Sequence, residues 1–357
     1  MTRQAYVGID VGGTKVLAGI VDHFGRVQRT SRRTTPGRRV ESRHVEDALT
    51  EALAEVTEGL PVAGVGLAAA GFVDATGERV MFAPHLPWLD EPVRARLEDR
   101  WGVPVVLEND ATAAAHAEAT YGAGRHANDV IMVTMGTGIG GGIILERRIH
   151  RGRNGMAGEF GHMQVVPDGI PCECGGHGCW EQYSSGNALV RYARSRIGSQ
   201  PTVLEELCSG RPADLTGPMV NAAAEDGDLV AQEAFRQVGE WLGVGLANLV
   251  AAFDPECLVV GGGVSAAGDR LLVPARTALT HSLVAAGQRT VPAILPAQLG
   301  PEAGLVGASD LVRRRVAAST ISPRRWLRKT PVAKGLRARA KASGGTANRA
   351  ADRRESR

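Results

Sequence analysis

The chain has 357 residues, which is enough for two domains of ordinary size, and its balance of 43% hydrophobic to 22% charged residues is typical of a soluble globular protein. No apolar run reaches the roughly 20 residues that a membrane-spanning helix needs. Five cysteines, three of them clustered, do not resemble a secreted disulfide framework. The N-terminal MTRQAYVGID lacks the pattern of a secretory signal, so we expect a cytoplasmic protein with no membrane partner.

The net charge of +3 is distributed unevenly along the chain. From residue 320 onward, twelve Lys or Arg stand against two acids, so this stretch carries +10 and residues 1–319 carry −7. Residues 320–357 are rich in Arg, Lys, Ala, Ser and Gly without apolar periodicity, which predicts a disordered basic tail. We interpret the tail as a dispensable extension; weak tethering to nucleic acid or to an anionic surface is the alternative.

The first part of the chain alternates predicted strands and helices. In AYVGIDVGGTKVLAGIVD, β-branched residues flank a glycine pair, which predicts two strands joined by a tight turn. The elements that follow are a helix at 45–60, a strand at 62–71, a Pro-rich loop at 83–88, a helix at 92–101, a strand at 103–110 and an Ala-rich helix at 111–122.

The strand–glycine–strand theme returns at 130–146. Helices are predicted from about 185 to 253, a strand followed by glycines at 257–268, and a closing helix at 302–316. This alternation indicates α/β layers, and the paired glycine turns suggest a duplicated domain with a cleft between the halves. The predicted domains are a small one at 1–112, completed by a C-terminal helix at about 302–318, and a large one at 113–301 that contains the Cys/His segment 158–182.

Three glycine-rich turns are candidates for binding a nucleotide, because glycine lets backbone N–H groups approach phosphate closely. Asp10 can hold Mg²⁺ through water. Neither a P-loop nor a Rossmann spacing is present, and an ordinary turn is the alternative for each turn taken alone. The candidate residues are Asp10, Gly12, Gly13, Thr14, Lys15, Gly136, Thr137, Gly138, Gly140, Gly261, Gly262 and Gly263.

Asp110 stands where an apolar strand ends and the Ala-rich helix begins. Helix capping alone would explain an acid here. However, α/β proteins also place functional side chains at the C-terminal ends of strands, and a helix N-terminus helps to keep a carboxylate ionised. An ionised Asp110 can accept the proton of a sugar hydroxyl as its oxygen attacks a γ-phosphate.

The segment CECGGHGC places three cysteines ten or more residues after a histidine. Cys172, Cys174, Cys179 and His162 form a Cys₃His set suited to tetrahedral Zn²⁺. A redox centre would more often use C-x-x-C at a helix start, and His177 is a weaker alternative ligand. Four protein ligands leave no open position, so we expect a structural zinc.

Together these motifs resemble the ROK family of repressors and sugar kinases, and within it the bacterial glucokinases. The matching pieces cover about residues 5–316 in family order: IDVGGTK, GLAAAGFVD, FAPHLPW, VVLENDATAAA, MGTGIGGGI, GMAGEFGHMQV, CECGGHGCWEQY, LVVGGGV and EAGLVGASDL. The resemblance implies an actin-like/hexokinase-like ATPase fold with two α/β domains around a cleft. It also implies that Asp110 is the general base and that the sugar is bound by Gly71, Asn109, Asp110, Glu159, His162 and Glu181.

The implied activity is ATP-dependent phosphorylation of a hexose, glucose to glucose 6-phosphate first, with Mg²⁺ and a structural Zn²⁺ as cofactors. Kinases for N-acetylmannosamine, mannose, fructose or allose remain alternatives, as does polyphosphate as the donor. A sugar-sensing repressor is a further alternative, but repressors carry a helix-turn-helix ahead of the first strand, which here begins at about residue 5. We therefore expect no specific nucleic-acid partner, and the resemblance favours a homodimer or homotetramer.

The chain departs from the family pattern at two positions. His85 stands where many of the glucokinases have asparagine, which puts sugar affinity or choice in question. Thr112 replaces an asparagine on the helix after the predicted base, and there we expect little effect.

Overall fold

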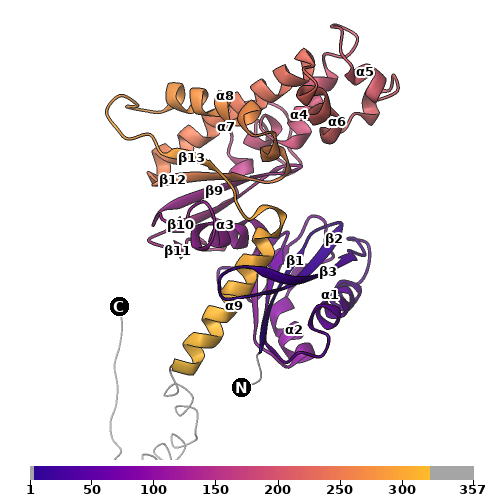
Figure 1. Ribbon diagram of the computed structural model, residues 1–357, viewed down its shortest axis with the longest axis vertical. Coiled ribbons are helices and arrows are strands. Elements are labelled where there is room, and N and C mark those ends of the chain that lie inside the picture. The colour runs from indigo at the N-terminus through magenta and orange to yellow at the C-terminus, as the bar shows by residue number, and fades with distance from the viewer. Residues whose placement is uncertain (1–3, 322–357) are drawn as a thin grey trace, which may run out of the picture. The chain divides into compact units, whose positions relative to one another are not determined.

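The computed structural model describes residues 4–321, with side chains up to Ser319, and the described residues up to Val316 form one compact unit (Figure 1). From residue 322 on, the predicted basic tail lies outside the described residues. Within residues 4–321, none of the helices has the length and apolar character needed to cross a membrane.

The first half of the chain forms a five-stranded sheet of order β3-β2-β1-β4-β8. β1 pairs antiparallel with β2 and parallel with β4, and β4 pairs parallel with β8. The chain between β4 and β8 forms a separate three-stranded sheet of order β5-β6-β7. The bounds are β1 (Ala5–Val11), β2 (Lys15–Val21), β3 (Val27–Thr34), α1 (Ser42–Thr57), β4 (Val62–Ala69), β5 (Phe72–Val73), β6 (Val80–Phe82), β7 (Leu89–Glu91), α2 (Val93–Trp101) and β8 (Val105–Asn109).

The second half repeats this arrangement in a sheet of order β11-β10-β9-β12-β13. Again the first two strands form an antiparallel hairpin, β9 with β10, and β9 pairs parallel with β12. The bounds are β9 (Val130–Met135), β10 (Ile139–Leu145), β11 (Arg148–Ile149), η1 (Phe160–His162), η2 (Trp180–Gln182), α4 (Gly186–Arg194), α5 (Leu204–Leu207), η3 (Pro212–Asp214), α6 (Gly217–Glu225), α7 (Leu229–Phe253), β12 (Cys257–Gly261), η4 (Gly263–Ala267), α8 (Asp269–Ser282), β13 (Ala293–Pro296) and η5 (Gly300–Glu302).

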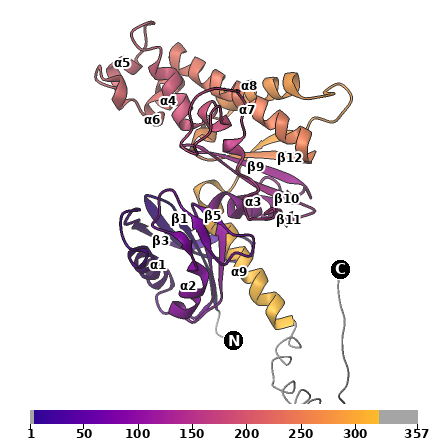
Figure 2. The ribbon, with the colours of Figure 1, turned by 180° about the vertical axis from the view of Figure 1, so that it is seen from behind.

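The long apolar helix α7 and its neighbour α8 cover one face of the second sheet, and α3 (Asp110–Thr120) covers the other (Figures 1 and 2). Ala114 and Ala115 of α3 belong to the same buried cluster as β9 and β12. Small side chains at these positions let the helix lie close to the sheet, and this fixes where its first residue, Asp110, points.

Helix α9 (Ala303–Ile321) returns to the first sheet. Its backbone comes so close that a Cβ on Gly8 would lie 1.9 Å from the Leu305 carbonyl oxygen, and one on Gly66 would lie 1.9 Å from the Ala308 carbonyl oxygen. The glycines of β1 and β4 are therefore required by packing. The helix predicted at 302–316 is observed as α9, and it packs on β1 and β4. That it completes a small N-terminal domain stays a prediction.

The predicted α/β class and the order of the main elements are confirmed. The sequence prediction missed β3, whose VQRTSRRT lacks an apolar face, and also β13 and α8. The residues predicted as a Pro-rich loop connect β6 and β7, which are too short to give a periodic pattern. The division into domains at residue 112 stays a prediction.

Candidate active site

One small cavity gathers most of the predicted sugar-binding residues. Its volume is about 180 Å³, below the roughly 300–1,000 Å³ of typical small-molecule sites, so it suits a single sugar ring. Gly71, Asn109, Asp110, Glu159 and His162 line it together with Ala70, Phe72, Pro84, His85, Ala111, Gly140 and Gly141. These residues come from five separate stretches of the chain, at 70–72, 84–85, 109–111, 140–141 and 159–162.

Asn109 and Asp110 are held by the turn from β8 into α3. Asn109 is the N-cap of α3, and its side-chain oxygen accepts from the Thr112 backbone N–H at 2.9 Å. Its amide nitrogen donates to the Gly71 carbonyl and to Asp110 Oδ1, each at 3.1 Å. The same Asp110 oxygen accepts from the Ala111 N–H at 2.9 Å. The Asp110 carboxylate is therefore oriented by two donors.

Burial raises the pKa of Asp110, and the hydrogen bonds from the Ala111 N–H and the Asn109 amide oppose that rise. Glu159 faces the same cavity, and its pKa is also raised, first by burial and then by the negative charges of Asp110 and Glu181. His162 acts in the opposite direction on Glu159. Two partly buried carboxylates that face one cavity need hydrogen-bond donors, so the cavity favours a ligand with several hydroxyl groups.

Glu181 is not among the residues that line this cavity. Its Oε1 lies 3.2 Å from the Cys172 sulfur and 3.7 Å from His162 Nδ1, and its Oε2 accepts weakly from the Ile139 N–H at 3.4 Å. Glu181 thus lies at the border between the cavity and the Cys/His group. Its predicted contact with the sugar stays a prediction.

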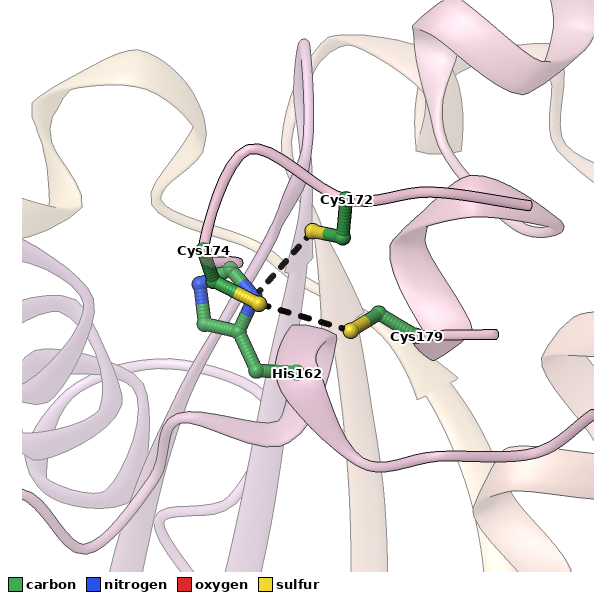
Figure 3. A group of neighbouring side chains, drawn as sticks. All are labelled: His162, Cys172, Cys174 and Cys179. Atoms are coloured by element: carbon green, nitrogen blue, oxygen red, sulfur yellow. Dashed lines mark hydrogen bonds between the residues drawn. The ribbon is translucent and has the colours of Figure 1, made fainter. Parts of the chain in front are cut away.

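The Cys/His group converges as the spacing predicted (Figure 3). The ligand atoms of His162, Cys172, Cys174 and Cys179 all lie within 4.8 Å of one another, and His177 is not part of the group. The sulfurs of Cys174 and Cys179 are 3.6 Å apart. In a tetrahedron with Zn–S bonds of about 2.3 Å the sulfurs are about 3.8 Å apart, so the arrangement fits zinc closely.

A second cavity, of about 530 Å³, lies over the glycine turns of the second sheet. Gly136, Thr137 and Gly263 line it, together with Gly186, Asn187, Leu189, Val190, Gly217, Pro218, Asn221, Phe235, Val264 and Ala266. The mostly apolar wall with two asparagines suits a flat heterocyclic base, and the glycine backbone suits phosphate.

The other predicted nucleotide-binding glycines lie elsewhere. Gly138 packs beside the Glu181 carboxylate, and Gly140 lines the smaller cavity. Gly261 is buried against Ala297 and Met132, and Gly262 follows it with a φ of +86°, which only glycine adopts readily. Gly262 therefore allows the chain to turn before Gly263 reaches the larger cavity.

The first glycine turn, Asp10 to Lys15, lines neither cavity but adjoins the smaller one. The Gly12 N–H donates to the Lys15 carbonyl at 3.0 Å, which closes the turn, and a Cβ on Gly13 would lie 2.6 Å from that of His85. Burial raises the pKa of Asp10 to about 7, helped by the negative charge of Asp110 and opposed by Lys15. Asp10 is thus close enough to Asp110 for their charges to interact.

The apolar and amide walls of both cavities were not predicted from the sequence; they include Phe72, Asn187, Asn221 and Phe235. Each sits in a segment that reads as an ordinary helix or strand end, so no local signal was present. In the sequence His85 stands out only as a departure from the family pattern, and the structure places it in the wall of the smaller cavity.

Comparison with known proteins agrees with this geometry. The sequence profile of the ROK family matches residues 6–315. A glucokinase of Streptomyces coelicolor is 44% identical over 310 residues, which cover 86% of this chain and 97% of that protein. A xylose repressor of Bacillus subtilis is 27% identical over 311 residues, covering 86% of this chain and 76% of the repressor.

Among solved structures, a ROK family glucokinase from Streptomyces griseus in complex with glucose and AMPPNP superimposes with a TM-score of 0.79. It is 47% identical in sequence and covers 87% of this chain and 99% of its own.

Proposed function

The chain belongs to the ROK family, and from this premise we propose that it transfers the γ-phosphoryl group of ATP to a hexose, with D-glucose as the first substrate. The observation that supports this most directly is the smaller cavity, where Asn109, Asp110, Glu159 and His162 meet around a space for one sugar ring. The glucokinase complex with glucose and AMPPNP, 47% identical, supports the same pair of substrates.

In the proposed reaction Asp110 is the general base. Its carboxylate takes the proton from the primary hydroxyl of the sugar while that oxygen forms a bond to the γ-phosphorus. The bond between the γ-phosphorus and the bridging oxygen of the β-phosphate breaks, and ADP leaves with the electron pair. The donors from Ala111 and Asn109 hold the carboxylate in place, so little reorganisation is needed when the proton moves.

Binding and orientation are assigned to the residues around each cavity. Asn109, Glu159, His162 and Glu181 would hold sugar hydroxyls, with Gly71 at the cavity wall. Gly136, Thr137 and Gly263 would cradle the nucleotide in the larger cavity, and Gly12, Gly13, Thr14 and Lys15 would approach the transferred phosphate. Asp10 would hold Mg²⁺, which neutralises phosphate charge when bound.

His162, Cys172, Cys174 and Cys179 would hold a Zn²⁺ with all four positions occupied, which is the pattern of a structural site. A metal at Nδ1 of His162 would leave Nε2 free to hydrogen-bond a sugar hydroxyl. The proposed role of the metal is therefore to fix the ring of His162 and the loop that carries Glu181.

A second candidate is a sugar-responsive regulator, because a xylose repressor matches over 311 residues. The kinase is favoured, since a regulator does not need the aligned Asp110 and the glycine-lined nucleotide cavity. A homodimer or homotetramer and a cytoplasmic location remain predictions.

Measurement of hexose phosphate formation over a panel of glucose, mannose, fructose, allose and N-acetylmannosamine, with ATP or polyphosphate as donor, tests the proposal. With ATP, ADP release is measured in parallel. We expect the highest kcat/KM with glucose and ATP. If no sugar supports ADP release above the hydrolysis background, the proposed function is wrong, and a preference for another hexose would correct only the substrate.

A further inference from the structure

An ion pair links Glu108, the residue before the cavity-lining Asn109, to Arg151 in the second half of the chain. Arg151 Nε donates to Glu108 Oε2 at 2.8 Å, and a terminal nitrogen of the same guanidinium donates to the same oxygen. Only 4% of the Glu108 side chain is exposed, against 33% of that of Arg151. Glu108 belongs to β8 of the first sheet, whereas Arg151 follows β11 of the second. The pair therefore connects two structural halves.

In the first sheet, Glu108 precedes the proposed base, Asp110, by two residues in the sequence. The second Glu108 oxygen, Oε1, accepts from the backbone N–H of Asn109 at 3.2 Å. Asn109 in turn caps α3 and donates to Asp110. The orientation of the Glu108 carboxylate is thus linked through one backbone group to the turn that orients Asp110.

On the other side, Arg151 stands at the base of the loop that leads to Glu159. The Ala157 N–H donates to the Arg151 carbonyl at 3.1 Å, which closes residues 151–157 into a compact turn. A Cβ on Gly158 would lie 2.7 Å from the Gly141 carbonyl oxygen, so the chain then passes tightly against β10 before it reaches Glu159. The position of Arg151 therefore influences where Glu159 enters the cavity.

Charge compensation explains only part of this arrangement. Burial raises the pKa of Glu108, and the Arg151 guanidinium is the main influence that opposes the rise. A buried carboxylate requires such a partner. Any cation nearby could compensate the charge of Glu108. The cation is Arg151, at the base of the loop that leads to Glu159, a proposed sugar-binding residue, and charge compensation alone does not require this.

We propose that Arg151 is a positioning residue for phosphoryl transfer, which holds the Glu159 loop against the strand end that bears Asn109 and Asp110 through its ion pair with Glu108. This inference rests on the proposed function, because the distance between Glu159 and Asp110 matters only if both serve one ligand. Arg151 does not line the smaller cavity, so it would act on the substrate only through the positions of Glu159 and Asp110.

The test compares Arg151→Ala, Arg151→Lys, Glu108→Gln/Arg151→Ala and Arg153→Ala with the wild-type chain. Arg153 is an exposed arginine of the same loop and serves as the matched control. Steady-state kinetics, glucose affinity by calorimetry and thermal unfolding are measured for each. We expect Arg151→Ala to lower kcat/KM by about 100-fold, the cost of a small misplacement of reacting groups, and Arg151→Lys to recover part of it.

The double variant separates positioning from stability. It leaves no unpaired buried charge, so its Tm should return toward the wild-type value while kcat/KM and glucose affinity stay low. If kcat/KM recovers together with Tm, or if Arg151→Ala behaves like Arg153→Ala, the positioning role is refuted. A wild-type chain that phosphorylates no hexose would instead refute the proposed function, and this inference with it.

Discussion

The Cys172 sulfur lies 3.2 Å from Glu181 Oε1, so the Cys/His group and a predicted sugar-binding carboxylate are in direct contact. A thiol can donate a hydrogen bond to this carboxylate, whereas the thiolate that binds zinc cannot. Metal binding and the position of Glu181 are therefore coupled through one sulfur atom.

Removal of the metal by a chelator should weaken glucose binding as well as lower Tm. The reason is that Cys172, His162 and Glu181 contact one another, so loss of the ion frees groups on both sides of the contact. Metal content by mass spectrometry, Tm and glucose Kd are measured on the same samples. Cys208→Ala, which alters a buried cysteine outside the group, is the control and should retain the metal. A metal-free sample with unchanged Tm and Kd would show that the coupling is absent.

Replacing the proposed base by its amide, Asp110→Asn, should lower kcat by roughly 10²–10⁴-fold, the usual contribution of a general base. Glucose binding should largely survive, because asparagine keeps the shape of the side chain and Asn109 remains in place. Single-turnover kinetics with ATP and calorimetry with glucose check the two halves of this expectation. A variant with near-normal kcat would exclude Asp110 as the base.

The pH profile of kcat/KM should show an acid limb above the ordinary aspartate value of 3.8, because burial raises the pKa of Asp110. A base works only when deprotonated, so activity is retained above the raised pKa and falls as the pH drops through it. Direct detection of ADP gives the profile without coupling enzymes. Tm at each pH is the control, since unfolding would produce the same loss. An acid limb at or below 3.8 would contradict the burial argument.

The larger cavity offers a test of the nucleotide site that does not disturb the fold. A Cβ on Gly263 would meet nothing within 4 Å and would project into space proposed for the nucleotide. Gly263→Val should therefore leave Tm unchanged and raise the KM for ATP, with little effect on glucose Kd. Gly287→Val, at another unobstructed glycine outside both cavities, is the control. An unchanged KM for ATP in Gly263→Val would place the nucleotide elsewhere.

His85 lines the smaller cavity, which we propose binds the sugar, and packs over Gly13 of the first glycine turn. Loss of one hydrogen-bonding side chain there should raise the KM for glucose by about 2- to 10-fold in His85→Ala, with kcat nearly unchanged. His85→Asn, which restores a donor and an acceptor, should recover most of the affinity. Kinetics across the hexose panel measure both variants. Identical KM values in wild type and His85→Ala would show that the side chain does not reach the sugar.

Local sequence patterns predicted much of the site. The Cys₃His set needs only short loops, so its spacing indicated the group that the structure brings together. Asp110 could be identified because the strand before it and the Ala-rich helix after it have strong intrinsic signals. The glycine turn at Gly136 and Thr137 could also be predicted, because the two strands of its antiparallel hairpin are neighbours in the sequence.

The α/β class, the Cys/His group and the candidate base could all be predicted from the sequence, because they depend on residues close together in the chain or on the period of apolar side chains. Three contacts could not be predicted in this way: Arg151 meets Glu108, His85 packs on Gly13, and Asn187 and Asn221 share a cavity with Gly263. Such contacts join segments tens of residues apart. They depend on how the sheets and helices pack, and the sequences of the contacting segments show no periodic pattern that would reveal this packing.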